Sequence, residues 1–229
     1  MRFKCLATGS TGNCYVLENQ AGQALLLDCG IRWKDIKRLL AYRIDNIVGC
    51  LVTHRHNDHS LSADEIIKSG IEVWKPYEVP GGAKTFGDFI VIPFKVPHDG
   101  VDCYGFYIKC DGQRLIYATD FEYLPFRFQK QRLNHMIIEC NYTQDMLELS
   151  DAKTSHVLAG HACLDTVKRI VQVNTTDNLM NVILIHASAL LDTEYTETEI
   201  SKETEANVYT AVPEMELELK EREICLGTS

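Results

Sequence analysis

Short apolar runs broken by polar turns dominate the first fifty residues of the chain. Residues 1–8, 14–19 and 24–30 are β-prone runs separated by the segments GSTGN and QAGQ, which have the composition of tight turns. Residues 31–44 place their apolar side chains at helical spacing. Residues 47–53 are apolar throughout, as in a strand that is buried on both faces. The pattern predicts three strands, a helix and a buried strand.

Helical and extended patterns alternate through the rest of the chain. Residues 61–70 predict a helix with Ser62 as its N-cap and Glu65 as the capping-box partner. A further helix is predicted at 163–174, and another begins in the acidic segment 196–208. Strands are predicted at 71–75, 89–96, 105–110, 114–120, 132–143, 181–188 and 208–212.

Neither a linker nor a repeat of fixed period interrupts this order. One domain over residues 1–229, an α/β arrangement of two sheets flanked by helices, fits the pattern best, although periodicity alone does not name the fold. No apolar run reaches the roughly 18 residues that a membrane helix needs. The N-terminus turns polar too early for a signal peptide. We therefore expect a cytoplasmic protein without a membrane anchor.

Charge and cysteine content narrow the choice of partners. The net charge is −9, whereas a protein that grips long nucleic acid usually presents a basic face. This balance favours a small substrate without excluding a local basic groove. The chain has nine cysteines and no CxxC pair, which favours reduced, buried thiols over a disulfide framework or a structural zinc site.

The densest group of chemically active side chains is the segment His54-Arg55-His56-Asn57-Asp58-His59, directly after the buried strand. Imidazole and carboxylate groups are preferred ligands of zinc and similar metals. A tight turn at a strand end can direct His54 and His56 to one ion and Asp58 and His59 to a second. The alternative is a solvated polar loop, but such a cluster is uncommon in a chain with eight histidines.

Four further residues of ligand type stand at the ends of apolar runs. Asp28 ends LLLD, His98 ends FKVPH, Asp120 ends LIYATD and His186 ends VILIH. A sheet brings the C-terminal ends of such strands to one edge. Each residue alone could be structural. Combined with the histidine cluster, the four complete two metal sites.

These motifs resemble those of the metallo-β-lactamase superfamily, in which HxHxDH is followed by a single His, a single Asp and a single His. The resemblance runs from GSTGNCYVLEN to ILIHAS and implies an αββα sandwich with its site at one edge of the sheets. It also implies two Zn²⁺ ions per chain, with Mn²⁺ as an alternative. The implied ligands are His54, His56 and His98 for the first ion, Asp58, His59 and His186 for the second, and Asp120 as a bridge between them.

The same resemblance implies a two-metal hydrolase. Two ions can share one hydroxide, lower its pKa and stabilise the charge of a phosphodiester transition state. Asp58 would also hold the attacking hydroxide in line, and Asp28 would orient a metal-bound histidine by a hydrogen bond.

His161 and Glu139 suggest the subclass. His161 lies in AGHACLDTVKRI, which is similar to the GHxT segment of the tRNase Z group, and Glu139 lies in IIECNY, where that group has its HEAT-type segment. The implied role of His161 is to donate a proton to the leaving oxygen or to bind the phosphoryl group. Glu139 would orient His161. A solvated His161 and a structural Glu139 are the alternatives.

Several relatives are disfavoured by particular positions. Asp120 stands where many zinc β-lactamases have Cys, and His56 where flavodiiron oxidoreductases have Glu. The chain has no room for the large inserted domain of the RNase J and cleavage-factor nucleases, and it lacks a basic Gly/Pro-rich arm of the kind that clamps tRNA. It resembles compact, RNase Z-like and YycJ-like hydrolases of phage type, a group that includes the phage anti-Pycsar phosphodiesterases.

The sequence therefore predicts a metal-dependent phosphodiesterase, with cyclic mononucleotides as the first substrate candidate and phage evasion of host defence, in the host cytoplasm, as the setting. A metal-dependent nuclease, either an exonuclease or a tRNA-processing endonuclease, is the second candidate. A non-catalytic metal-containing binding protein is the third, although a complete ligand set argues against it. A thioesterase or lactonase would leave His161 without a role. The resemblance also implies a homodimer.

Overall fold

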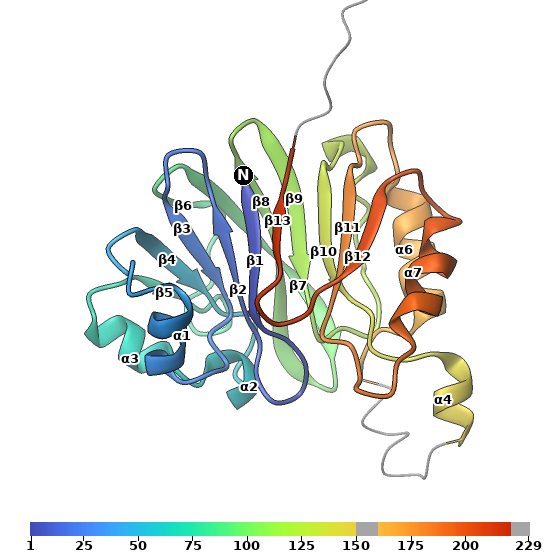
Figure 1. Ribbon diagram of the computed structural model, residues 1–229, viewed down its shortest axis with the longest axis horizontal. Helices are drawn as coiled ribbons and strands as arrows, with labels where there is room; N and C mark the ends of the chain where they lie inside the picture. The colour runs from blue at the N-terminus through green and yellow to red at the C-terminus, as the bar shows by residue number, and fades with distance from the viewer. Residues whose placement is uncertain (150–159, 221–229) are drawn as a thin grey trace, which may run out of the picture.

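Two β-sheets pack face to face at the centre of the molecule, and helices cover their outer faces (Figure 1). The computed structural model describes residues 1–149 and 160–220. Across these two ranges, no helix combines the length and the apolar composition needed to cross a membrane.

The first sheet combines strands from the beginning and the end of the described chain. Its order is β13-β1-β2-β3-β4-β5. The pairs from β13 to β3 are antiparallel, and β3, β4 and β5 run parallel. The strands are β1 (Arg2–Ala7), β2 (Cys14–Glu18), β3 (Ala24–Leu27), β4 (Ile47–Leu51), β5 (Val73–Trp74) and β13 (Glu216–Glu218).

The second sheet has the order β12-β11-β10-β9-β8-β7-β6. Its half from β6 to β9 is antiparallel, and its half from β9 to β12 is parallel. The strands are β6 (Lys84–Phe86), β7 (Phe89–His98), β8 (Val101–Cys110), β9 (Gln113–Ala118), β10 (His135–Glu139), β11 (Asn181–Ile185) and β12 (Asn207–Thr210).

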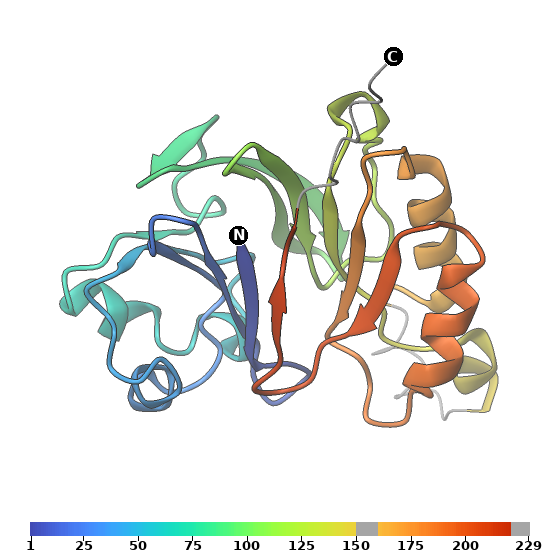
Figure 2. The same ribbon diagram turned by 45° about the horizontal axis from the view of Figure 1, so that its top comes forward.

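Helices cover both outer faces. The first sheet carries α1 (Trp33–Leu39) and α3 (Ala63–Lys68), and the second carries α6 (Leu164–Asn174) and α7 (Thr193–Ser201), which lie side by side in Figures 1 and 2. The remaining helical segments are α2 (Asn57–Ser60), α4 (Gln144–Leu149) and a 3-10 turn at Gln129–Gln131.

The apolar side chains form three layers, one between the sheets and one under the helices on each side. Strands that are buried on both faces explain this arrangement. In β3, Leu25 and Leu27 point into the core between the sheets, whereas Leu26 packs under α1 and α3. In β11, Ile183 points into the central core and Leu184 packs under α6 and α7. Because successive strand residues alternate between faces, a continuous apolar run fills two layers at once. This arrangement is the predicted αββα sandwich.

The predicted elements agree with the structure in type, with some differences. Strands β6 and β13 and helices α2 and α4 were not anticipated, because all four are short and lack a clear period. Ser62 is the N-cap residue of α3, as predicted, but the capping box is absent. The side chain of Ser62 makes no cap hydrogen bond, and its hydroxyl donates to the carbonyl of Ile31.

Eight cysteines of the described ranges are free, and all of them except Cys163 are buried. The ninth, Cys225, lies outside the described residues.

Candidate metal centre

The ends of several strands deliver polar side chains to one edge of the sandwich. The chain leaves β4 and turns through residues 54–60, which include α2. Glycine allows a close approach behind this turn, because a Cβ on Gly30 would lie 1.7 Å from the carbonyl oxygen of Asp58. That oxygen also accepts the backbone N–H of Asn13 at 2.7 Å. The GSTGN loop therefore fixes the turn that carries the histidine motif.

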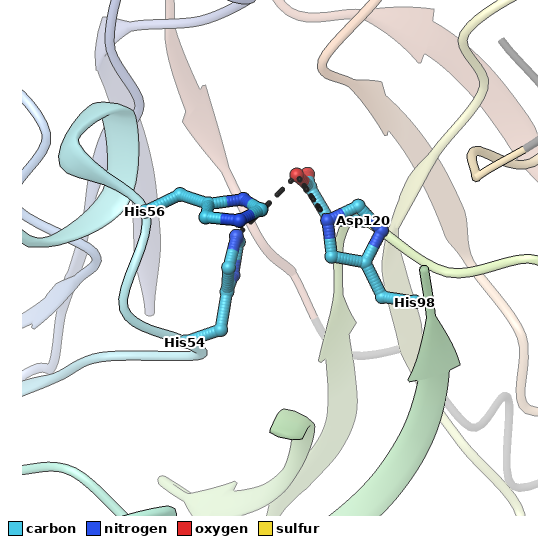
Figure 3. Close-up of side chains that lie close together, drawn as sticks. All are labelled: His54, His56, His98 and Asp120. Atoms are coloured by element: carbon cyan, nitrogen blue, oxygen red, sulfur yellow. Dashed lines mark ion pairs between the residues drawn. The ribbon is translucent and has the colours of Figure 1, made fainter. Parts of the chain in front are cut away.

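His54, His56, His98 and Asp120 form the first group of potential ligands, shown in Figure 3. His54 and His56 come from the turn after β4, whereas His98 ends β7 and Asp120 follows β9. Nε2 of His54 and Nε2 of His98 each lie 3.6 Å from Oδ2 of Asp120. In this group and the next, one potential ligand atom per residue lies within 4.8 Å of all the others.

Asp58, His59, Asp120 and His186 form the second group. Nε2 of His59 lies 3.3 Å from Oδ2 of Asp58 and 3.4 Å from Oδ1 of Asp120. Nε2 of His186 lies 3.7 Å and 3.6 Å from the same two oxygens. Asp120 therefore presents Oδ2 to the first group and Oδ1 to the second.

Two observations show that a pair of metal ions fits these residues. Ligand atoms about 2.0–2.2 Å from a tetrahedral zinc ion stand roughly 3.3–3.6 Å apart, which matches the nitrogen–oxygen separations above. In addition, the buried Nε2 atoms of His54, His98 and His186 have no hydrogen-bond partner among the described residues. Buried polar atoms are rarely left unpaired, so the three nitrogens are suited to binding a cation. The His/Asp clusters are consistent with a binuclear metal site.

The opposite ring nitrogen of each buried histidine is held by the protein. Nδ1 of His59 lies 2.8 Å from Oδ2 of Asp28. Nδ1 of His98 donates to the carbonyl of Gly160 at 2.9 Å. Nδ1 of His54 lies 3.0 Å from the hydroxyl of Thr53. Such contacts on Nδ1 leave Nε2 directed at the centre, as is usual for metal-binding histidines.

Three residues at this edge have a strained backbone. Asp28, Asp120 and His186 have φ values of 58°, 51° and 53°, in the left-handed region that non-glycine residues seldom adopt. Each follows the end of a strand, where the left-handed backbone turns its side chain toward the centre. Strain of this kind costs on the order of 1–3 kcal/mol and persists only where surrounding contacts impose it.

Burial and neighbouring charges shift the pKa values of the ligands in different directions. Burial disfavours a charged Asp120, but His186 and His59 outweigh that effect and hold its pKa well below the ordinary value. Burial lowers the pKa of His54 to about 2. A deprotonated carboxylate and a neutral imidazole are the forms that bind metal. Burial disfavours charged His59 and His186, but the carboxylates around them outweigh burial and raise the pKa values of both imidazoles above the ordinary value, so a bound ion would displace a proton from each.

His161 and Glu139 lie beside the second group. Nδ1 of His161 is 2.5 Å from Oε1 of Glu139, and the same oxygen is 3.2 Å from Nδ1 of His186. The rings of His161 and His186 stack with centroids 5.1 Å apart. Together with Asp120 these residues form a third cluster. Both carboxylate oxygens of Glu139 already have hydrogen-bonding partners, namely the two imidazoles and the backbone N–H of Phe121. We therefore assign this cluster to hydrogen bonding rather than to a third ion.

The structure brings all ten candidate site residues singled out in the sequence to one edge. Asp28 accepts from His59 and lies behind the centre, and His56 is the exposed member. Sequence reasoning missed three supporting groups. Thr53 bonds both Asp28 and His54, the hydroxyl of Tyr117 donates to Asp28 at 2.6 Å, and Asn141 lies 3.1 Å from Nδ1 of His186. Only the position of Thr53 beside the motif could have suggested such a role.

Comparisons with known proteins agree with this fold. A sequence model described as the metallo-beta-lactamase superfamily matches residues 7–78. The exodeoxyribonuclease YycJ of Bacillus anthracis is 26% identical over 219 residues, covering 82% of this chain and 83% of the relative.

Solved structures show the same architecture. The metallo-beta-lactamase fold protein YhfI from Bacillus subtilis aligns with a TM-score of 0.72 at 16% identity, covering 94% of this chain and 98% of that structure. The short form of human tRNase Z aligns with a TM-score of 0.63 at 14% identity, covering 96% of this chain and 100% of that structure. The predicted αββα fold is therefore confirmed.

Proposed function

We propose that this chain, a metal-dependent hydrolase of the metallo-beta-lactamase superfamily, cleaves phosphodiester bonds at the end of a DNA strand. The observation that carries the phosphodiester chemistry is the position of His161. Its ring stacks on His186 at the second metal group, and its Nδ1 is held by Glu139. A phosphodiester needs a proton donor for its leaving oxygen beside the site of attack, and the contacts of His161 support this role.

The ligand groups supply the rest of the mechanism. Two divalent ions in this centre would provide a water of lowered pKa and neutralise charge on the phosphate oxygens. We assign His54, His56 and His98 to the first ion, Asp58, His59 and His186 to the second, and Asp120 to both. Zinc is the expected ion, with manganese as the alternative.

Individual side chains then have separate tasks. Asp58 presents Oδ2 to the centre, from where it can accept a hydrogen bond from the attacking water and hold it in line. Burial lowers the pKa of His161, but the carboxylate of Glu139 outweighs burial and raises it above the ordinary value. His161 is therefore more readily protonated than an ordinary imidazole, and its Nε2 proton can pass to the leaving oxygen while Glu139 keeps Nδ1 in place.

The choice of DNA as substrate is supported by the relative from Bacillus anthracis, which is named an exodeoxyribonuclease and matches over most of both chains. Cyclic mononucleotides are the second candidate, because the net charge of −9 disfavours long polyanions away from any local basic surface. A role in phage evasion of host defence belongs to that second candidate. Homodimer formation also stays a prediction.

A substrate panel tests the proposal. Zinc-loaded protein is incubated with end-labelled single-stranded and duplex DNA, tRNA precursors and cyclic mononucleotides, and the products are separated. We expect mononucleotides released from DNA ends. Cleavage of cyclic nucleotides alone would replace the exonuclease proposal with the second candidate, and internal cuts in tRNA precursors would indicate an endonuclease. A protein that cleaves no phosphodiester would refute the proposed chemistry.

A further inference from the structure

A hollow of about 460 Å³ opens beside the metal centre. His98, which belongs to the first ligand group, forms part of its wall, so the hollow adjoins one of the metal-binding residues. Pro97, Val101 and Phe126 give the wall an apolar surface, and Asp102 and Glu122 add carboxylates. The volume lies within the range of small-ligand sites.

The charge of this hollow disfavours a phosphate group. Its one lysine, Lys95, is paired with Asp102 at 2.5 Å. Glu122 accepts the backbone N–H of Asp99 and has no cation beside it among the described residues. Carboxylates accept hydrogen bonds from the N–H groups of nucleobases but repel phosphates. The hollow therefore suits a nucleoside, while its phosphate lies at the metal centre.

A second hollow, of about 390 Å³, lies on the other side of Phe126, which lines both. Its charge is opposite to that of the first hollow, because Arg127 and Arg169 contribute to its wall. Both arginines are exposed, and neither has an ion pair or a side-chain hydrogen bond within residues 1–149 and 160–220. In a chain with a net charge of −9, two unpaired guanidinium groups in one hollow form a local site for anions.

Exposed aromatic rings accompany these arginines. Tyr123 is 56% exposed and Phe126 is 45% exposed. The ring of Phe126 is held from behind, with its centroid 5.8 Å from that of Phe94 and 6.5 Å from that of Phe128. Exposed rings beside a basic groove are the elements with which proteins bind single-stranded nucleic acid.

We infer that the two hollows form one path for a single-stranded nucleic acid. The terminal nucleoside occupies the hollow beside His98, the next base stacks on Phe126, and the following phosphates contact Arg127 and Arg169. This inference rests on the proposed phosphodiesterase function and extends it to a polymeric substrate. The stack on Phe126 requires an unpaired base within the strand, because bases inside a duplex already stack on one another.

Binding of a strand tests the path separately from catalysis. The probe is a fluorescent single-stranded oligothymidylate of about twelve nucleotides, with phosphorothioate linkages that resist cleavage, added to zinc-loaded protein. The R127Q/R169Q variant should bind it more weakly than the unchanged protein. The slope of log Kd against log salt should become shallower by about 1.4, the value for two phosphate contacts on a single strand.

The matched control is the K34Q/R43Q variant, which removes the same charge from two exposed residues on the other outer face, Lys34 in α1 and Arg43 in the turn that follows it. It should leave both the Kd and the salt slope unchanged. Equal weakening in the two double variants would overturn the inference, because it would show a general charge effect. Absence of strand binding by the unchanged protein would overturn it as well.

A second pair of variants tests stacking. Phe126→Ala should weaken binding of the oligothymidylate by roughly 5- to 150-fold, the range for loss of one stacked base. Tyr42→Ala removes a ring that is 69% exposed on the other face and should have no effect. If Phe126→Ala also has none, the path does not run over this ring and the inference fails.

Hydrolysis of thymidine 5′-p-nitrophenyl phosphate by the same proteins separates this inference from the proposed function. If the unchanged protein cleaves this ester but R127Q/R169Q binds the strand normally, the path is wrong and the phosphodiesterase proposal stands. If the ester and all DNA survive while strand binding depends on Arg127 and Arg169, the proposed function is wrong and the binding surface stands.

Discussion

The carboxylate of Glu139 holds the imidazole of His161, with Oε1 and Nδ1 2.5 Å apart. Glu139 ends β10 in the middle of the second sheet, whereas His161 lies just before α6. The pair therefore joins a rigid strand to a loop at the metal centre. It separates proton transfer, which we assign to His161, from metal binding, which we assign to the residues around Asp120.

His161→Ala should retain metal and fold but lose roughly 10²–10⁴-fold in the rate of DNA hydrolysis, because the leaving oxygen loses its proton donor. The loss should be smaller for a p-nitrophenyl ester, whose leaving group departs without a proton. Rates on the two substrates, measured with the same preparation, test this expectation. Equal losses would mean that His161 binds the phosphoryl group, and no loss would leave it without a role.

Protein purified without chelator should contain about two zinc or manganese ions per chain, as a two-metal site requires. His56→Ala should lose metal and activity together, because it removes a proposed ligand. Elemental analysis provides the measurement. His135→Gln changes a histidine far from the centre, bonded to Gln113 and Asn181, and should retain both ions. One ion or fewer in the unchanged protein would contradict the two-metal site.

Asp28→Asn should weaken metal binding by about 10- to 100-fold, the usual effect of removing the partner of a ligating histidine. Asp28 is fully buried and also accepts hydrogen bonds from Thr53 and Tyr117. With the substitution, His59 would lose the carboxylate that orients its ring. Competition with a chelator of known affinity measures the change. Asp64→Asn, at an exposed position of α3, serves as the control. Because the substitution could affect folding, Tyr117→Phe provides a milder variant with a smaller expected loss.

Gly30→Ala should destabilise the protein by about 1–3 kcal/mol, the usual cost of forcing extra volume into a packed site. The added Cβ would meet the carbonyl of Asp58 at 1.7 Å, so the turn that carries the histidines has to move and metal loading should fall as well. Gly82→Ala is the matched control, since nothing lies within 4 Å of its added Cβ. Urea unfolding gives the comparison. An unchanged midpoint for Gly30→Ala would show that the turn is less rigid than its contacts indicate.

His135 should make the free energy of unfolding depend on pH below neutrality. Burial, followed by the positive N-terminus, lowers its pKa to about 3, whereas an exposed histidine titrates near 6.5. Between these values the unfolded chain binds a proton that the folded protein does not. Stability is therefore lost as the pH falls from about 6.5 toward 3, by up to about 1.4 kcal/mol per pH unit.

Unfolding of chelator-treated protein at several pH values, compared with His135→Gln treated in the same way, isolates this contribution. The variant cannot take up the proton, so its stability should vary less between pH 6.5 and pH 4. Parallel curves for the two proteins would assign the acid sensitivity to other groups.

Local sequence determined the chemistry of the centre. The histidine motif places four ligand-type side chains in one turn after β4, and Asp28, Asp120 and His186 each follow an apolar run that could only be a buried strand. Since parallel strands end at the same edge, their grouping could be predicted without coordinates. Because these strands are apolar at successive positions, both faces of each sheet had to be covered by further layers.

Tertiary structure decided which groups support and surround the centre. Tyr117 and Asp28 are 89 residues apart and meet at 2.6 Å, and no period in the sequence links them. No sequence pattern relates Phe126 and Arg127, in the loop after β9, to Arg169 in α6, yet the three residues line one hollow. Their relation depends on how the loop after β9 packs against α6. The periodicity of apolar residues indicates which face of an element is buried. Contacts between elements that are distant in sequence depend on how their side chains fit together, and this fit exists only in the folded chain.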